Sequence, residues 1–163
     1  MPLIADAWSG LVAAREMRTI GDDEMKNVLL LVHDDAGQEA RFQAALDATR
    51  ALDGHLICVD VTRIPMVYAG AYSDGGLAMC LEEDRAREVE NRRLLERRLS
   101  VEGVCWTWYD YTGTFVEGIL DVSGMADLIV LNRKLEAASA PDMRRLAGDI
   151  LLSARKPVLA VPD

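Results

Sequence analysis

Short apolar runs alternate with longer amphipathic stretches along most of the chain. The first run, Val28-Leu29-Leu30-Leu31-Val32, contains no polar residue, which is typical of a parallel strand buried on both faces. Another segment, 104–109, alternates instead, with cysteine, threonine and tyrosine on one side and tryptophan on the other. The pattern predicts five strands, at 28–32, 56–61, 104–109, 127–131 and 157–161.

Three of the segments between these strands carry apolar residues at helical spacing. The segment 81–99 is highly charged instead, and its acids and arginines, such as Glu88 and Arg92, form pairs four residues apart. In the last segment, Met143, Leu146 and Ile150 recur with the period of one helix face. The pattern predicts four helices, near 40–52, 81–99, 115–122 and 141–154. Because a helix separates every pair of strands, we expect a single-domain α/β fold. Its core is predicted to be a doubly wound, five-stranded parallel sheet with helices on both faces.

Four residues have the chemistry of helix ends. Asp35 stands where its carboxylate can cap the first helix, and Gly54 fits the left-handed position that ends a helix. Thr114 and Glu117 have the spacing of a capping box at the start of the third helix. We therefore expect these residues to fix the limits of two helices.

The chain has 163 residues, the size of one domain, and a formal net charge of -9. This acidic balance argues against non-specific binding to nucleic acid or to an anionic membrane, because both need a positive field. No apolar run approaches the roughly 20 residues of a membrane-spanning helix, so we expect no membrane association. Residues 1–25 differ in pattern and are predicted to be an N-terminal extension of a domain at 26–163.

The three cysteines, Cys58, Cys80 and Cys105, are widely spaced. No CxxC motif or Cys/His cluster accompanies them, so we expect no structural zinc site. An odd number without close spacing also argues against a disulfide scaffold. Reduced thiols, and with them a cytoplasmic localisation, are the expectation.

Ligands of open α/β sheets bind at the carboxyl ends of the strands, which makes the residues after each predicted strand candidates. Asp34 and Asp35 could hold a divalent cation through carboxylate oxygens, although adjacent carboxylates at a helix start commonly cap the helix and contact water. Three arginines near the end of the fourth predicted strand and in the last predicted helix, Arg133, Arg144 and Arg145, could form a local anion site or be ordinary surface charges. The candidate ligand-binding residues are His33, Asp34, Asp35, Val61, Asn132, Arg133, Arg144 and Arg145.

Three segments, in this order and spacing, resemble the universal stress protein (UspA-like) family. They read Lys26-Asn-Val-Leu-Leu-Leu-Val, Ala126-Asp-Leu-Ile-Val and Pro157-Val-Leu-Ala-Val. The resemblance runs from about Lys26 to Asp163 and implies an adenine nucleotide alpha hydrolase-like fold. It also implies a homodimer through the last strand, which fits the need of an apolar edge strand for a partner. The predicted dimer edge consists of Val158, Leu159, Ala160 and Val161.

One branch of this family binds ATP, with a Gly-x2-Gly-x9-Gly-Ser/Thr pattern after the fourth strand and an aspartate closing the first. Here Asn132 stands where the first glycine is expected, and Arg144 and Arg145 stand near the Gly-Ser pair. His33 stands at the position of the aspartate. Long side chains would block the approach of phosphate to backbone amides. The resemblance therefore implies weak ATP binding or none, and we expect no cofactor.

These observations leave four hypotheses about function. The leading hypothesis is a non-enzymatic stress-response accessory protein that acts as a dimer through protein partners or a small ligand. The second is an ATP- or AMP-binding module with a divergent phosphate loop. The third is a receiver-like domain, although Asn132 replaces the phospho-acceptor aspartate. The fourth is an independent enzyme, for which the sequence holds no triad, metal cluster or cofactor fingerprint.

Overall fold

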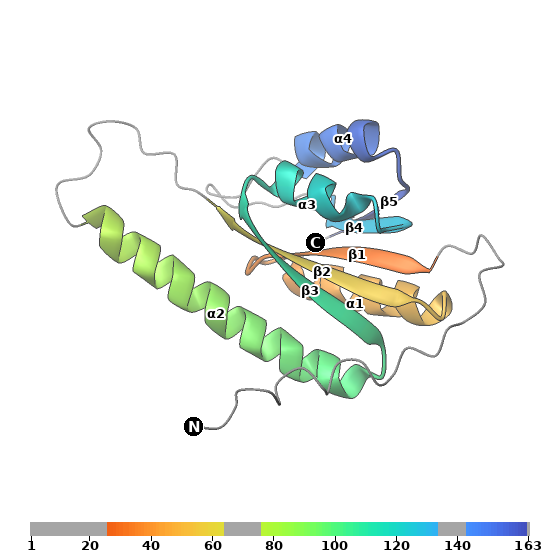
Figure 1. Ribbon diagram of the computed structural model, residues 1–163, viewed down its shortest axis with the longest axis horizontal. Coiled ribbons are helices and arrows are strands. Elements are labelled where there is room, and N and C mark those ends of the chain that lie inside the picture. Colours follow the sequence, from red (N-terminus) through yellow and green to blue (C-terminus); the bar gives the residue numbers. More distant parts are fainter. Residues whose placement is uncertain (1–25, 64–75, 134–142, 163) are drawn as a thin grey trace, which may run out of the picture.

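A computed structural model of the chain describes residues 26–63, 76–133 and 143–162. All nine expected elements are present and alternate between strand and helix, which confirms the predicted fold class (Figure 1). The predicted extension, residues 1–25, lies outside the described residues. The elements are β1 Asn27–Val32, α1 Gln38–Ala51, β2 His55–Arg63, α2 Gly76–Glu102, β3 Cys105–Gly113, α3 Phe115–Ser123, β4 Leu128–Asn132, α4 Met143–Ala154 and β5 Val158–Val161.

The sheet has the strand order β3-β2-β1-β4-β5, and every neighbouring pair is parallel. The order reverses between β1 and β4. In open α/β sheets, ligands bind at the carboxyl edge beside such a reversal. A receiver-like domain has the order 2-1-3-4-5 instead, and the observed order excludes that hypothesis.

Helices cover both faces of the sheet, with α1 and α2 on one side and α3 and α4 on the other (Figure 1). Alternate residues of β1 divide between the two cores: Leu29 and Leu31 pack toward α3 and α4, whereas Val28 and Leu30 pack toward α1. This explains why β1 reads as an uninterrupted apolar run. In the described ranges, none of the helices is both long and apolar enough to cross a bilayer.

The turn between α1 and β2 corrects one prediction. The left-handed residue is Asp53, with φ of 46°, and not Gly54. Gly54 is needed for a different reason, because a Cβ there would overlap the backbone carbonyl of Lys26. The amide of Gly54 also donates to the carbonyl of Thr49 at 2.9 Å. The glycine therefore permits a close approach between two backbones.

The capping box of α3 is confirmed. The amide of Glu117 donates to Thr114 Oγ1 at 3.2 Å, and the amide of Thr114 donates to Glu117 Oε2 at 3.0 Å. These reciprocal bonds satisfy two amide donors that a helix start leaves without partners. They fix the point at which the chain leaves β3 and packs α3 onto the sheet.

Two strands are longer than the sequence predicts. β2 continues to Arg63 and β3 to Gly113, and the two remain paired over this whole length. Asp60 and Asp110 therefore lie opposite each other within the sheet. Asp60 falls inside the predicted strand 56–61, whereas Asp110 was expected just after the predicted strand 104–109. This extension brings carboxylates of two strands together.

Candidate functional site

The most fully bonded side chain of the carboxyl edge is that of Arg41 in α1, a residue that is not among the candidates predicted from the sequence. It is completely buried. Its Nε donates to the carbonyl of Leu31 at 3.0 Å, and its Nη2 donates to the carbonyl of His33 at 3.0 Å. Two further bonds reach the Asp35 carboxylate, at 3.1 and 3.0 Å, and a fifth reaches Asn132 Oδ1. The five N–H donors of the guanidinium thus face five acceptors.

Asp35 is a partner of this arginine and not the cap of α1. The N-cap of α1 is Gly37, which has no side chain to cap with, and this corrects the prediction. Asp35 Oδ1 accepts the amide of Gly37 at 2.8 Å, while its carboxylate forms a two-pronged ion pair with Arg41. Such paired bonds hold both groups in one plane. The β1–α1 loop is therefore fixed by its own carboxylate.

Asn132 joins the end of β4 to the start of α1. Its side chain is completely buried, and its Nδ2 donates to the carbonyl of Gly37 at 3.1 Å. A Cβ at Gly37 would overlap the Asn132 amide, so the glycine allows this approach. The amide is thus used on both sides, by Gly37 and by Arg41. We call Arg41, Asp35, Asn132 and Gly37 the Arg41 cluster.

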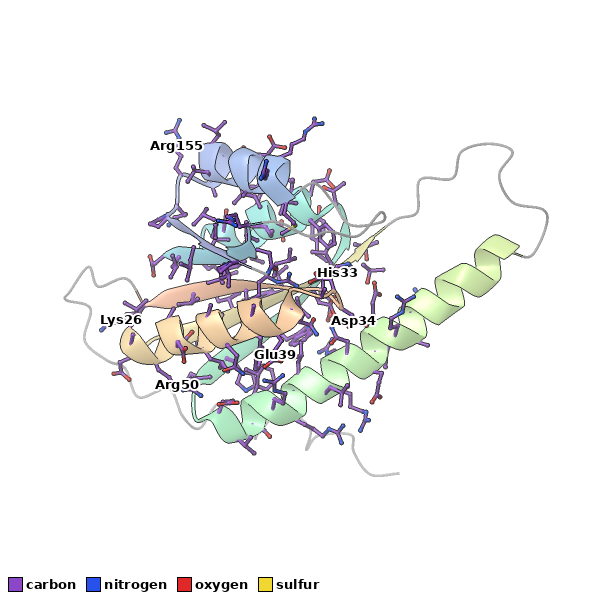
Figure 2. The ribbon with its side chains drawn as sticks, turned by 180° about the vertical axis from the view of Figure 1, so that it is seen from behind. Lys26, His33, Asp34, Glu39, Arg50 and Arg155 are labelled. Carbon is purple, nitrogen blue, oxygen red and sulfur yellow. The ribbon has the colours of Figure 1, made fainter. Side chains whose placement is uncertain are left out.

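Three further candidates, His33, Asp34 and Val61, lie at or near the ends of β1 and β2, and they differ in exposure. Asp34 is exposed, and His33 is half-buried with its ring edge on Phe115, the centroids 4.9 Å apart. Figure 2 shows both at the end of β1, beside the start of α1. Val61 is buried in the core below α3, where a Cβ at Gly118 would come within 2.7 Å of it. Val61 is therefore a packing residue in this structure.

The three candidate arginines after β4 are exposed. The amide of Arg133 donates to the carbonyl of Val161 at 2.7 Å, and its side chain is exposed. In α4, Arg145 lies 3.9 Å from the Asp149 carboxylate, and Arg144 is exposed beside it. Residues 134–142, which connect these positions, lie outside the described residues. An anion site here stays a prediction.

A second group of charges lies where β2 and β3 face α2. Arg92 of α2 binds the Asp110 carboxylate at 2.9 and 2.8 Å and Glu96 at 2.8 Å. Its guanidinium also lies 5.1 Å from the ring centre of Trp108. Thr62 Oγ1 donates to Glu88 Oε2 at 3.1 Å. We call Asp60, Glu88, Arg92, Glu96 and Asp110 the acidic cluster.

Asp60 is the perturbed member of the acidic cluster. Burial, together with the charges of Glu88 and Asp110, raises the pKa of its carboxyl from 3.8 to about 7, while Arg92 and a backbone hydrogen bond at Val61 oppose the rise. Carboxylates therefore outnumber the arginine that faces them, and a proton on Asp60 relieves the excess. Within the described residues, no three His, Cys, Asp or Glu side chains are grouped so as to hold a metal ion.

The sequence did contain a signal for Arg41. The buried residues of α1 are Arg41, Phe42, Ala45, Leu46 and Thr49, so the arginine lies on the apolar stripe. A charged residue in such a stripe is a buried ion that needs partners. No local pattern pointed to Asp60, because its charged neighbours Glu88 and Asp110 lie on other elements.

Neither a protein-family model nor a curated protein matches the sequence. Solved structures do match. UspA from Lactobacillus plantarum is 16% identical, with a TM-score of 0.64 over 86% of this chain and 99% of that one. A universal stress protein family member from Burkholderia pseudomallei is 21% identical, with a TM-score of 0.61 over 88% and 100%. One from Arabidopsis thaliana, solved with AMP bound, is 13% identical, with a TM-score of 0.58 over 84% and 91%. The chain has the universal stress protein fold.

Proposed function

We propose that the chain works as a universal stress protein of the branch that does not depend on ATP: a non-enzymatic, cytoplasmic stress-response accessory protein. It acts as a homodimer through protein partners or a small ligand. The observation that carries the proposal is that the side chain of Asn132 is hydrogen-bonded to Gly37 and to Arg41. In the ATP-binding branch a glycine is expected at this position, whereas here a buried side chain ties β4 to α1.

Two features of the carboxyl edge support this proposal. Phosphate is bound by N–H donors at helix starts and glycine-rich turns. At the start of α1, the amide of Gly37 donates to Asp35 Oδ1 at 2.8 Å, and the five donors of Arg41 also have acceptors.

The edge strand β5 supports the homodimer. β5 lies at the end of the sheet order, and Leu159 on it is 40% exposed. On the neighbouring helix α4, Leu151 and Leu152 are exposed as well. An unpaired apolar edge strand beside exposed leucines is suited to pair with a second copy.

The dimer is tested with a charge on this edge. Leu159→Asp should shift the molecular mass in solution, measured by light scattering, from dimer to monomer, because a buried carboxylate at the interface lacks a partner. Val101→Asp is the matched control, since Val101 is an exposed apolar residue of α2 far along the chain. A wild-type protein that is monomeric at high concentration would contradict the homodimer.

The alternative is an ATP- or AMP-binding module with a divergent phosphate loop, favoured by the AMP-bound structure from Arabidopsis thaliana. Calorimetric titration of the wild-type protein with ATP and with AMP, each with magnesium, separates the two functions. The proposal predicts no saturable heat at submillimolar nucleotide. A micromolar dissociation constant for either nucleotide would favour the alternative.

A further inference from the structure

We infer that the groups around Arg41 form a cradle selective for a planar guanidinium cation, and that Arg41 is the internal ligand of this cradle. The inference goes beyond the proposed function, because it assigns a ligand chemistry to the acceptors gathered where β1 and β4 end. It rests on the geometry and composition of the acceptors.

The acceptors come from three separate parts of the chain. The carbonyls of Leu31 and His33 belong to the end of β1, the Asp35 carboxylate to the following loop, and Asn132 Oδ1 to the end of β4. Asn132 lies 91 residues along the sequence from Arg41 itself. A cradle assembled by the fold from such distant residues persists as long as the sheet is intact.

The acceptors match a guanidinium and no smaller cation. The Asp35 carboxylate takes two parallel N–H bonds, at 3.1 and 3.0 Å, which is the geometry of a flat forked donor. The Leu31 carbonyl, at 3.0 Å from Nε, accepts from the third side of the same planar group. An ammonium ion has donors that point to the corners of a tetrahedron and would leave acceptors unpaired.

The charge of the cradle has the sign that a cation needs. Among the described residues, every hydrogen-bond acceptor of the guanidinium is an oxygen, and the Asp35 carboxylate carries a full negative charge. A phosphate placed there would meet a carboxylate and three other oxygens with partial negative charge. The cradle therefore discriminates against the phosphates of a nucleotide, even when the arginine is removed.

Chemical rescue tests the cradle. Arg41→Ala removes the internal ligand, and methylguanidinium chloride at millimolar concentration is the probe, with sodium chloride at equal ionic strength as reference. We expect the melting temperature of Arg41→Ala to rise by about 3–5 °C with methylguanidinium, because a ligand bound only to the folded state stabilises it. Methylammonium chloride should give no such rise.

The matched control is Arg50→Ala on the same helix. Arg50 is an exposed arginine whose guanidinium pairs with Asp47 and Glu102 at the surface. Its replacement leaves no buried acceptors, so methylguanidinium should not raise its melting temperature above the sodium chloride value. Equal responses of the two variants would overturn the cradle.

A second measurement covers the case in which Arg41→Ala does not fold. In the wild-type protein, the Nε–H nuclear magnetic resonance signal of Arg41 should persist at pH 8, because Arg41 is buried and bonded. The corresponding signal of Arg50 should exchange with water. Loss of a protected arginine signal in the folded wild-type protein would overturn the inference.

The two proposals fail separately. Micromolar ATP binding by the wild-type protein would contradict the proposed function while leaving the rescue of Arg41→Ala to be decided by its own experiment. Conversely, a folded Arg41→Ala variant whose melting temperature does not rise with methylguanidinium would overturn the cradle. The titration of the wild-type protein with nucleotide would still test the proposed function.

Discussion

The carboxyl edge of the sheet holds two charge clusters that differ in balance. In the Arg41 cluster, one buried cation meets one carboxylate and neutral acceptors. In the acidic cluster, Arg92 faces several carboxylates, and the pKa of Asp60 rises to about 7. The same edge of one sheet therefore contains a region of matched charge and a region with a surplus of acid. The comparison shows that burial alone does not decide whether a side chain stays charged at neutral pH. The number of oppositely charged or hydrogen-bonding partners matters as well.

The largest expected effect comes from breaking the balanced cluster. Arg41→Ala should lower the free energy of unfolding by about 3–5 kcal/mol, because the Asp35 carboxylate and Asn132 lose their buried partner. Urea unfolding followed by circular dichroism measures this. Arg50→Ala, which breaks surface ion pairs, should cost about 0.2–1 kcal/mol. Equal losses for the two variants would contradict the comparison.

The next effect comes from relieving the acidic cluster. The folded state holds the Asp60 proton more tightly than the unfolded chain, whose pKa stays near 3.8. Stability from this proton is therefore complete below pH 3.8 and is lost as pH rises through about 7. Asp60→Asn should remove that loss and raise the free energy of unfolding by about 2 kcal/mol at pH 8, after allowance for partial solvent exposure.

The matched control for this prediction is Asp121→Asn, on the exposed side of α3. Urea unfolding at pH 5 and at pH 8 gives the comparison. Asp60→Asn should flatten the pH dependence between these values, whereas Asp121→Asn should follow the wild type. An Asp60→Asn variant that is less stable than the wild type at pH 8 would show that the carboxylate has a stabilising partner.

A smaller effect tests the approach of α1 to β4. Gly37→Ala should destabilise the fold by about 1–2 kcal/mol, because its Cβ would overlap the Asn132 amide and displace it from Arg41. Gly148→Ala is the control, since a Cβ at Gly148 meets nothing within 4 Å. A helix-interior glycine replaced without a clash should stabilise by about 0.5–1 kcal/mol. Thermal unfolding of both variants should therefore shift in opposite directions.

The smallest effect concerns the cap of α3, which belongs to neither cluster. Thr114→Ala should cost about 1 kcal/mol, because the Glu117 amide loses its acceptor. Thr112→Ala, at an exposed threonine of β3, is the control. Denaturant midpoints of the two variants measure the difference. Equal midpoints would mean that the capping box adds nothing to the folded state.

The elements that could be predicted from the sequence are those whose residue types recur at regular spacing along the chain. Apolar runs and helical stripes located eight of the nine elements, and charge pairs four residues apart located α2. The three-residue spacing from Thr114 to Glu117 located the cap of α3. Each of these signals lies within a few neighbouring residues. Strand ends were less predictable. β2 and β3 support each other beyond Val61 and Tyr109 through pairing that no local pattern contains.

The clusters themselves depend on contacts between distant residues. Arg41 and Asn132 are 91 positions apart, and only the strand order β2-β1-β4 brings them together. The sequence therefore identified Asp35 and Asn132 as candidates by position, yet could not show that a third residue connects them. The loop after the first strand was expected to present its acid to a helix end, and it presents it to a buried arginine instead.

The most direct test of the central claim, that Arg41 fills this site and nucleotide does not, follows Arg41 while AMP is added. The Arg41 Nε–H signal of the wild-type protein is followed by nuclear magnetic resonance while AMP and magnesium are added to millimolar concentration. The account predicts that the signal stays at one position and remains protected, since Arg41 keeps its five acceptors. A shift of this signal that saturates at micromolar AMP would contradict the account.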